Sequence, residues 1–212
     1  MRTRSRSVAL LLFDEVELLD VAAPLAVLSS AGRKWNWRPF KVTTVAATPG
    51  RISTRNQLVV EAEGTLDACP EPELLILPGG YGARRAVSDS ALIDWVRQAG
   101  SAAGLVMTVG HGALLAASAG LADDQELAVP LDARELLEEI APTARAAGDA
   151  PGVVESNKLL STARSAAALD LALTAVTLLL GRGEALGVAA ALGHEMHGAD
   201  PPLLIDVDEK RG

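Results

Sequence analysis

The sequence predicts a single-domain, doubly wound α/β/α sandwich with a mostly parallel central sheet. Two patterns predict this fold class: short continuous apolar runs, and segments between them that carry apolar residues at helical spacing. Runs without polar alternation are typical of strands that are buried on both faces, as in parallel sheets. No linker rich in Gly, Pro or Ser divides the 212 residues, so we expect one domain over 1–212 with a tail from about residue 199.

The first part of the chain predicts strands joined by a helix and a hairpin. Residues 21–31 carry apolar side chains at helical spacing and stop at Gly32, a residue type that commonly ends helices. The apolar run at 74–77 passes directly into Gly79 and Gly80 after one proline, which favours a turn. The expected elements are a strand at 8–13, the helix at 21–31, a strand at 42–47, a hairpin at 52–60 and a strand at 74–77.

The rest of the chain repeats this alternation. Ser88 is placed to cap a helix that ends at Gly100, because a serine hydroxyl accepts a hydrogen bond from a first-turn amide. A turn near Asn157 favours a second hairpin. The expected elements are the helix up to Gly100, a strand at 104–109, helices at 112–119 and 132–140, the hairpin at 153–162, and helices at 166–180 and 184–192.

Charge and cysteine content exclude several classes of protein. The net charge of −8 repels phosphate backbones, so we expect no direct binding to nucleic acid. A hydrophobic content of 49% excludes a disordered chain. Cys69 is the only cysteine, so no disulfide can form within the chain and a structural zinc site lacks thiolates. These features fit a reducing cytoplasm.

The apolar segments are too short for export or membrane insertion. The run at 8–13 ends at Asp14 and Glu15, well short of a signal-peptide core. The stretch at 166–180 is interrupted by Asp170 and is shorter than a membrane span. We therefore expect a cytoplasmic protein without membrane contact.

The candidate site lies in the loops that follow the core strands. In open α/β sheets, ligands bind beyond the carboxyl ends of the strands. Three loops meet this condition: 14–20, 78–82 and 109–112. The segment from Thr108 to Ala113 passes abruptly from strand to helix with small residues around the turn, which is the build of a nucleophile elbow. Gly110 stands at its centre.

Four stretches of this chain resemble the ThiJ/PfpI superfamily, also called class I glutamine amidotransferase-like. The resemblance is strongest to its branch of isonitrile hydratases and ligand-binding domains of AraC-type regulators, and it covers nearly the whole chain. It implies a flavodoxin-like version of the predicted fold and a homodimer. The stretches that carry it are residues 12–24, 74–82, 112–121 and 160–173.

The resemblance also implies roles for individual residues. Asp20, four residues before Pro24, matches the family's acid, and the Gly79 and Gly80 pair matches the backbone amides offered to an oxyanion. The family's elbow usually carries cysteine; the matching residues here are Gly110, His111 and Gly112. The family's nucleophilic sulfur is therefore absent. Glycine adopts the strained backbone conformation without a side-chain clash, so the turn itself is kept. The usual Thr-His-Trp after the elbow helix is replaced by Val129, Pro130 and Leu131.

Each candidate residue has a structural alternative. Asp20 either acts as a general base or simply caps a helix that starts near Val21. His111 either contacts a ligand, as a binding group or proton donor, or faces solvent in a first helical turn. Gly79 and Gly80 either present amides or only form a turn. Tyr81, the one tyrosine, is a candidate shield for the pocket.

Other polar residues are expected to be structural. His194, His197 and Asp200 have a spacing compatible with a metal site, but nothing near them completes a coordination shell, so we expect a solvated helix end and no metal. Asp170 requires a hydrogen-bond partner in its apolar helix. Cys69 enters the strand at 74–77 from the end opposite the elbow and is expected to be a structural or surface thiol.

Two functions remain open, and neither requires a cofactor. The first is a small-molecule-binding or sensor pseudoenzyme that keeps the family's pocket without its covalent step. The alternative is a hydratase or lyase without a cysteine nucleophile, in which Asp20 activates water. A purely oligomeric role is a third possibility. A regulatory role would require a DNA-binding partner, because 212 residues leave no room for a helix-turn-helix domain beside the predicted fold.

Overall fold

The computed structural model of the chain describes residues 4–33, 36–148 and 152–196. Its centre is a seven-stranded sheet in the order β10-β11-β7-β6-β1-β2-β5. All neighbouring strands are parallel except β10 and β11. The strands are β1 (Arg6–Leu11), β2 (Phe40–Ala46), β5 (Gly64–Thr65), β6 (Leu74–Leu77), β7 (Leu105–Val109), β10 (Val154–Ser156) and β11 (Leu159–Thr162).

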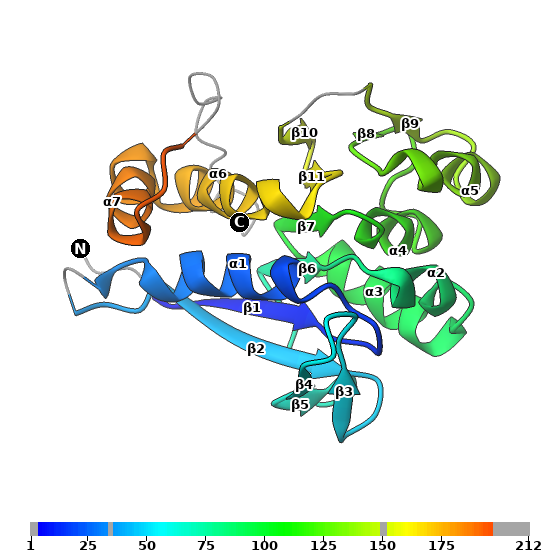
Figure 1. The fold of residues 1–212 in the computed structure, drawn as a ribbon, viewed down its shortest axis with the longest axis horizontal. Helices are drawn as coiled ribbons and strands as arrows, with labels where there is room; N and C mark the ends of the chain where they lie inside the picture. Colours follow the sequence, from blue (N-terminus) through cyan, green and yellow to red (C-terminus); the bar gives the residue numbers. More distant parts are fainter. Residues whose placement is uncertain (1–3, 34–35, 149–151, 197–212) are drawn as a thin grey trace, which may run out of the picture.

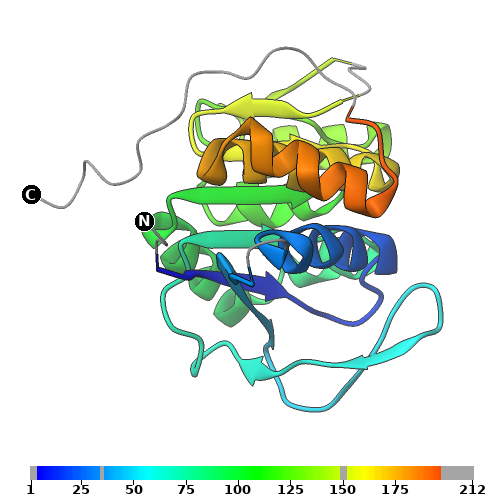
Figure 2. The same cartoon turned by 90° about the vertical axis from the view of Figure 1, so that its left-hand side faces the viewer.

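Two helical layers cover the sheet, which confirms the predicted α/β/α sandwich (Figures 1 and 2). One layer comprises α1 (Leu18–Ser30), α6 (Ala168–Leu180) and α7 (Arg182–Leu192). The other layer comprises α2 (Tyr81–Ala86), α3 (Ser90–Ala102), α4 (Gly112–Ser118) and α5 (Arg134–Ile140). Two separate apolar clusters fill the spaces between the sheet and these layers.

The central strands are buried on both faces, as their continuous apolar runs predict. All residues of β6 and β7 are buried. Register sets their relative height: Val8 pairs with Leu74, and Leu74 pairs with Leu105. The parallel strands therefore end at one edge of the sheet, here called the carboxyl edge, where the loops after β1, β6, β7 and β11 meet.

Smaller elements decorate the sandwich. The predicted hairpin at 52–60 is confirmed, and so is the turn at Asn157, whose φ is +53°. The sequence analysis does not predict the short strands β5, β8 and β9 or the helix α2. The bounds of these short elements are β3 (Arg51–Ser53), β4 (Val59–Glu61), β8 (Glu126–Leu127) and β9 (Arg145–Ala146), with the 3-10 turns η2 (Leu131–Ala133) and η3 (Ser165–Ala167).

Two helix starts differ from expectation. Helix α1 begins at Leu18, so Asp20 lies inside its first turn, and the prediction that Asp20 caps the helix is wrong. Helix α3 begins at Ser90 and is capped by Asp89, whose carboxylate accepts a hydrogen bond from Leu92 N at 3.2 Å, so Ser88 is not the cap. Both differences are small, and helix ends are the part of an element that sequence patterns define least closely.

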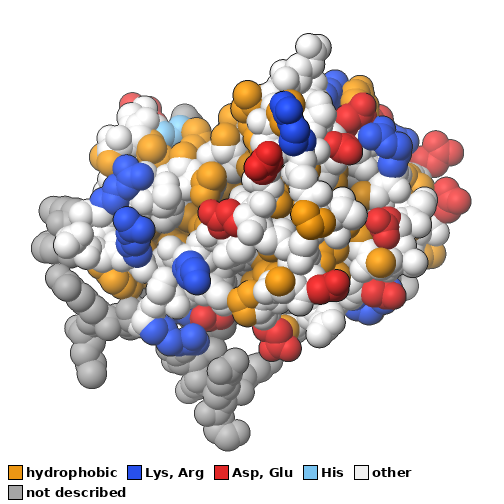
Figure 3. Space-filling view, turned by 90° about the horizontal axis from the view of Figure 1, so that it is seen from below, with side chains coloured by type: hydrophobic (Ala, Val, Ile, Leu, Met, Phe, Trp, Pro, Cys, Tyr) orange, Lys and Arg blue, Asp and Glu red, His pale blue; other side chains and the backbone are white. Residues whose placement is uncertain are grey.

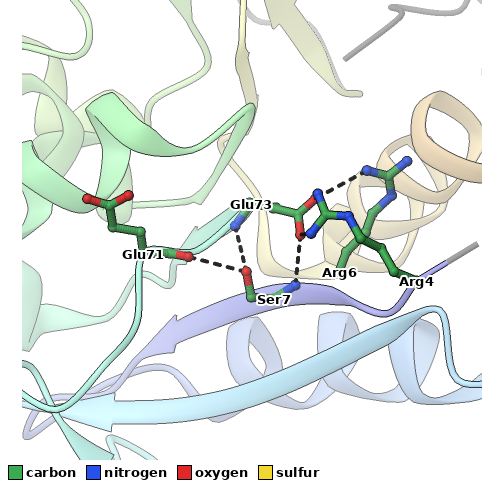
Figure 4. Close-up of polar contacts among 5 residues, drawn as sticks. All are labelled: Arg4, Arg6, Ser7, Glu71 and Glu73. Atoms are coloured by element: carbon green, nitrogen blue, oxygen red, sulfur yellow. Dashed lines mark hydrogen bonds and ion pairs between the residues drawn. The ribbon is translucent and has the colours of Figure 1, made fainter. Parts of the chain in front are cut away.

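A polar cluster closes the opposite edge of the sheet (Figure 4). The Glu73 carboxylate accepts hydrogen bonds from both terminal nitrogens of Arg4, at 3.0 and 3.1 Å, and from Arg6 Nη1 at 3.3 Å. Ser7 N also donates to it at 3.4 Å. Its backbone oxygen accepts from Gly104 N and Leu105 N. Glu73 therefore joins the starts of β1, β6 and β7, and we call this group the amino-edge cluster.

The outer surface carries both charges. Figure 3 shows acidic, basic and hydrophobic side chains interspersed on the face seen from below in Figure 1. Within the described ranges, no helix has the length and hydropathy needed to cross a bilayer. The expected tail from residue 199 lies outside these ranges.

Candidate functional site

Three loops of the carboxyl edge bring the predicted residues together. Asp20 comes from the first turn of α1, Gly79 follows β6, and Gly110 follows β7. Gly79 N donates a hydrogen bond to Asp20 Oδ2 at 2.9 Å. Residues that lie far apart in sequence thus form one contact group around a buried carboxyl.

Gly110 has the geometry of an elbow apex. Its φ is +54°, a left-handed conformation that is unfavourable for residues with a side chain, and its amide donates to Thr162 O at 2.8 Å. A Cβ built on Gly110 would lie 3.7 Å from Asp20 Oδ2 and 4.0 Å from Ala163 O. Both distances are ordinary van der Waals contacts. A side chain at this apex would therefore fit sterically and point toward Asp20.

The neighbouring glycines are required by close packing. A Cβ on Gly79 would lie 2.7 Å from both Asp20 Oδ2 and Val109 O, and one on Gly112 would lie 2.0 Å from Leu77 O. Gly80 has a φ of +113° and approaches Glu15 O. These three positions exclude any side chain, which distinguishes them from Gly110.

The two glycine amides after β6 have different partners. Gly79 N is committed to Asp20, so this amide is not available to an oxyanion while the hydrogen bond stands. Gly80 is buried, and its N–H donates to no other residue in the described part of the chain. Gly80 N is thus the amide that a ligand oxygen can use. The expectation that these amides bind an oxyanion stays a prediction.

The Asp20 side chain is held in an environment that favours its neutral form. The residue is 1% exposed, and burial raises its pKa from 3.8 to about 6. The Ser165 hydroxyl and the Gly79 amide oppose this rise, while the charge of Glu17 adds to it. Asp20 Oδ1 is buried and has no hydrogen-bond partner among the described residues. A carboxyl in this state can accept a hydrogen bond or a proton near neutral pH.

His111 lies beside the elbow in a partly enclosed position. Its side chain is 12% exposed, and Nε2 is 3.2 Å from Asp132 Oδ2. The Tyr81 ring lies 6.2 Å away with a tilt of 44°. His111 thus contacts Asp132 and the Tyr81 ring, and its role toward a ligand stays a prediction. Asp132 orients the imidazole and also pairs with Arg84 at 3.2 Å.

The β3–β4 hairpin reaches this side of the site. The Arg55 guanidinium lies 4.0 Å from the centroid of the Tyr81 ring, and Arg55 N donates to Val16 O at 3.0 Å. Tyr81 itself is 47% exposed, and its role as a shield for the pocket stays a prediction. Sequence reasoning missed Arg55, Asp132 and Ser165, because none of them lies in a loop directly after a predicted core strand.

A groove opens next to the elbow. Its volume is about 540 Å³, within the usual range for small-molecule sites. Ala163 lines the groove, and its carbonyl oxygen is one of the atoms nearest to the Cβ position of Gly110. The groove therefore adjoins the apex. Its lining comprises Val129, Pro130, Leu131, Asp132, Arg134, Gly148, Ala163 and Arg164.

The remaining candidates lie away from this site. Cys69 precedes β6, whereas the site residues follow it; its thiol donates to Pro70 O at 3.4 Å, and burial raises its pKa. His194 Nε2 lies 2.8 Å from Asp170 Oδ1 and supplies the partner that Asp170 was predicted to need. No metal-binding group of three or more side chains occurs in the ranges that the structure describes, and His197 and Asp200 lie outside them.

Sequence comparisons connect the chain to named proteins. Residues 6–178 match the DJ-1/PfpI family. Isonitrile hydratase of Pseudomonas putida is 26% identical over 174 residues, which span 82% of this chain and 72% of that protein. An HTH-type transcriptional regulator of Mycobacterium tuberculosis is 53% identical over 49 residues, which are 23% of this chain and 19% of the regulator.

Solved structures have the same fold. A ThiJ/PfpI family protein from Pseudomonas syringae superimposes with a TM-score of 0.81 at 22% identity, covering 95% of this chain and 78% of that one. An AraC family transcriptional regulator from Pseudomonas putida gives 0.71 at 24% identity, covering 88% and 99%. Drosophila melanogaster DJ-1beta gives 0.77 at 21% identity, covering 91% and 100%. At these identities the likeness concerns the fold alone.

Proposed function

Because the chain belongs to the DJ-1/PfpI family, we propose that it binds a small molecule at the Asp20 site as a sensor or pseudoenzyme, without thiol chemistry. One observation carries the proposal: Gly110 occupies the elbow apex, and the position of its missing Cβ lies 3.7 Å from the buried Asp20 carboxyl. The oxygen nearest to this position is Oδ2, and the other oxygen of the same carboxyl, Oδ1, lacks a partner among the described residues. A polar guest would satisfy this oxygen.

Ligand-induced stabilisation tests the proposal. Thermal unfolding is measured with small nitriles, aldehydes and amides for the unmodified protein, Asp20→Ala and Cys69→Ser. A guest at a hundred times its Kd stabilises the folded state by about 2.7 kcal/mol, which raises the Tm by about 5 °C in a chain of this size. We expect this shift in the unmodified protein and in Cys69→Ser, but not in Asp20→Ala. Absence of a shift with every compound, or an equal shift in Asp20→Ala, contradicts the proposal.

A second candidate function rests on the raised pKa of Asp20. With a pKa of about 6, the carboxyl is mostly ionised at pH 7 yet basic enough to activate a water molecule. In this candidate mechanism, Gly80 N and His111 polarise a small electrophile. Isonitriles are reasonable substrates to test, because a relative carries the name isonitrile hydratase. Turnover that disappears in Asp20→Ala would establish this activity, whereas turnover unaffected by the change would indicate a contaminant.

The Gly110→Cys variant tests whether the pocket has lost only the thiol or has diverged at other positions as well. A cysteine at the apex would place its Cβ near Asp20 without a steric clash. If isonitrile hydration appears in this variant, the rest of the family's machinery is intact. If the variant folds and remains inactive, the pocket has diverged beyond the loss of the thiol.

The assembly and location are also proposals. We propose a cytoplasmic homodimer, in keeping with the family resemblance and with a single half-buried cysteine. A sensor role additionally requires a DNA-binding partner or domain. Sedimentation equilibrium of the purified chain tests the dimer, and a monomer at micromolar concentration would exclude it.

A further inference from the structure

The groove beside the elbow combines an apolar wall with a cationic side chain. Val129, Pro130 and Leu131 form part of the wall, at the positions where the resembling family carries Thr-His-Trp. Leu131 is 71% exposed, so this wall opens to solvent. Arg164 lines the same groove from the segment between β11 and η3. Apolar walls with a small number of polar or charged groups are typical of sites for small ligands.

The charges in the groove favour an anionic guest. Asp132 is the one acidic residue of the lining, and Arg84 and His111 both contact its carboxylate, at 3.2 Å each. Arg134 is a second cation of the lining, and its Nη2 donates to Ala147 O at 3.4 Å. No carboxylate in the described part of the chain forms an ion pair with Arg164. In a chain of net charge −8, this guanidinium is therefore placed to bind an anion at the carboxyl edge.

Arg164 is connected to the buried carboxyl by its neighbours in sequence. Ala163 O lies 4.0 Å from the Cβ position of Gly110, and the Ser165 hydroxyl lowers the pKa of Asp20. Three consecutive residues thus extend from the apex and Asp20 to the groove. A guest that extends from the groove past Ala163 to the apex would have Arg164 at one end and the Asp20 carboxyl near the other.

We propose that the guest of this site is a small molecule with a carboxylate at one end and an N–H or O–H donor at the other. The carboxylate binds Arg164, the donor hydrogen-bonds to Asp20 Oδ1, and the intervening carbons contact the wall formed by residues 129–131. This inference rests on the proposed binding function and adds the chemical class of the ligand.

Matched pairs of amido acids and diamides test the ligand class. Succinamate and glutaramate each carry one carboxylate and one primary amide, and succinamide and glutaramide are their neutral counterparts. Binding is measured by calorimetry at pH 7.5 and low ionic strength. We expect at least one amido acid to bind about fivefold more tightly than its diamide, as befits a solvent-accessible charge pair. The preference should fall as salt is added.

Variants assign the preference to Arg164. Arg164→Gln should lose the preference for the amido acid, and Arg164→Lys should retain part of it because the charge remains. Arg97→Gln is the matched control, because Arg97 pairs with Asp94 on α3 and does not line the groove. Thermal unfolding of each variant verifies that it is folded.

The outcomes separate this inference from the proposed function. Equal binding of amido acid and diamide, or a preference that survives Arg164→Gln, overturns the carboxylate assignment while the binding function stands. If none of the four compounds binds but other small molecules stabilise the protein through Asp20, the assignment also fails alone. Failure of every compound, here and in the thermal screen, overturns both.

Discussion

The two edges of the central sheet each hold a carboxylate, and their surroundings are opposite. Glu73 at the amino edge accepts hydrogen bonds from Arg4, Arg6 and Ser7, and its side chain is 27% exposed. Asp20 at the carboxyl edge is 1% exposed, and its Oδ2 accepts a hydrogen bond from Gly79 N. At the amino edge, the Glu73 carboxylate is paired with side chains and backbone of the protein. At the carboxyl edge, Asp20 Oδ1 has no hydrogen-bond partner among the described residues and can accept one from a ligand. Such an arrangement is typical of binding and catalytic sites.

The two edges also differ in how their strands and loops are held together. Side chains join the strands at the amino edge (Figure 4), whereas glycines pack backbone against backbone at the carboxyl edge. Gly80 and Gly110 both have positive φ values there. Strained, tightly packed turns persist where the surrounding structure holds them, and they position the groups of a site within narrow limits.

Substitution of Gly112 should have the largest effect on stability. A Cβ on Gly112 would lie 2.0 Å from Leu77 O, so Gly112→Ala should lower the free energy of unfolding by about 3 kcal/mol or more. Gly110→Ala has steric room and should lose only about 1 kcal/mol, from its left-handed backbone. Urea unfolding followed by circular dichroism measures both.

Gly187→Ala is the control for these glycine variants. Gly187 lies in α7 with nothing within 4 Å of its Cβ position, so alanine should stabilise the helix by about 0.5–1 kcal/mol. Equal losses at Gly112 and Gly110 would contradict the distinction between the packed glycine and the open apex.

Neutralising Asp20 should stabilise the protein at neutral and alkaline pH. Its pKa is about 6 in the folded state and 3.8 ordinarily, so the folded protein binds more protons between these values. Stability therefore falls as pH rises from about 4 to about 6, by up to about 3 kcal/mol. Asp20→Asn does not titrate, so its gain over the unmodified protein should be full at pH 8 and absent below pH 4.

Urea unfolding at pH 4, 5, 6, 7 and 8 measures this difference. The Asp20→Ala variant serves as the control for volume, because it combines the loss of charge with a small cavity. A gain in Asp20→Asn that is the same at pH 4 and pH 8 would show that charge burial is not its cause.

Neutralising Glu73 in the amino-edge cluster should change the free energy of unfolding only slightly, and in the opposite direction to Asp20→Asn. Glu73→Gln removes the ion pairs with Arg4 and Arg6 but can keep the hydrogen bond to Ser7 N. Because Arg4 is largely exposed, we expect a loss of about 1 kcal/mol or less. The loss should shrink further in 1 M NaCl. A gain in stability would mean that the two edges do not differ in the way described here.

Much of this architecture was predictable because local patterns encode it. The apolar runs that become β1, β6 and β7 have no polar alternation, and the hairpin at Asn157 follows from its turn residue. The short strands β5, β8 and β9 contain two residues each, so no periodicity can reveal them. Helix caps were misplaced at α1 and α3 because several neighbouring polar residues are compatible with capping, and sequence patterns do not define helix ends to within a residue or two.

The sequence alone determined the succession of the main strands and helices along the chain, the absence of a thiol at position 110, and the candidacy of Asp20, Gly79 and His111. Only the tertiary structure decided that Asp20 is buried, that Gly79 N is committed to it, and that Arg164 shares a groove with residues 129–131. The physical reason is that periodicity and turn chemistry are local, whereas desolvation and hydrogen-bond partners arise between segments that meet only when the sheet forms.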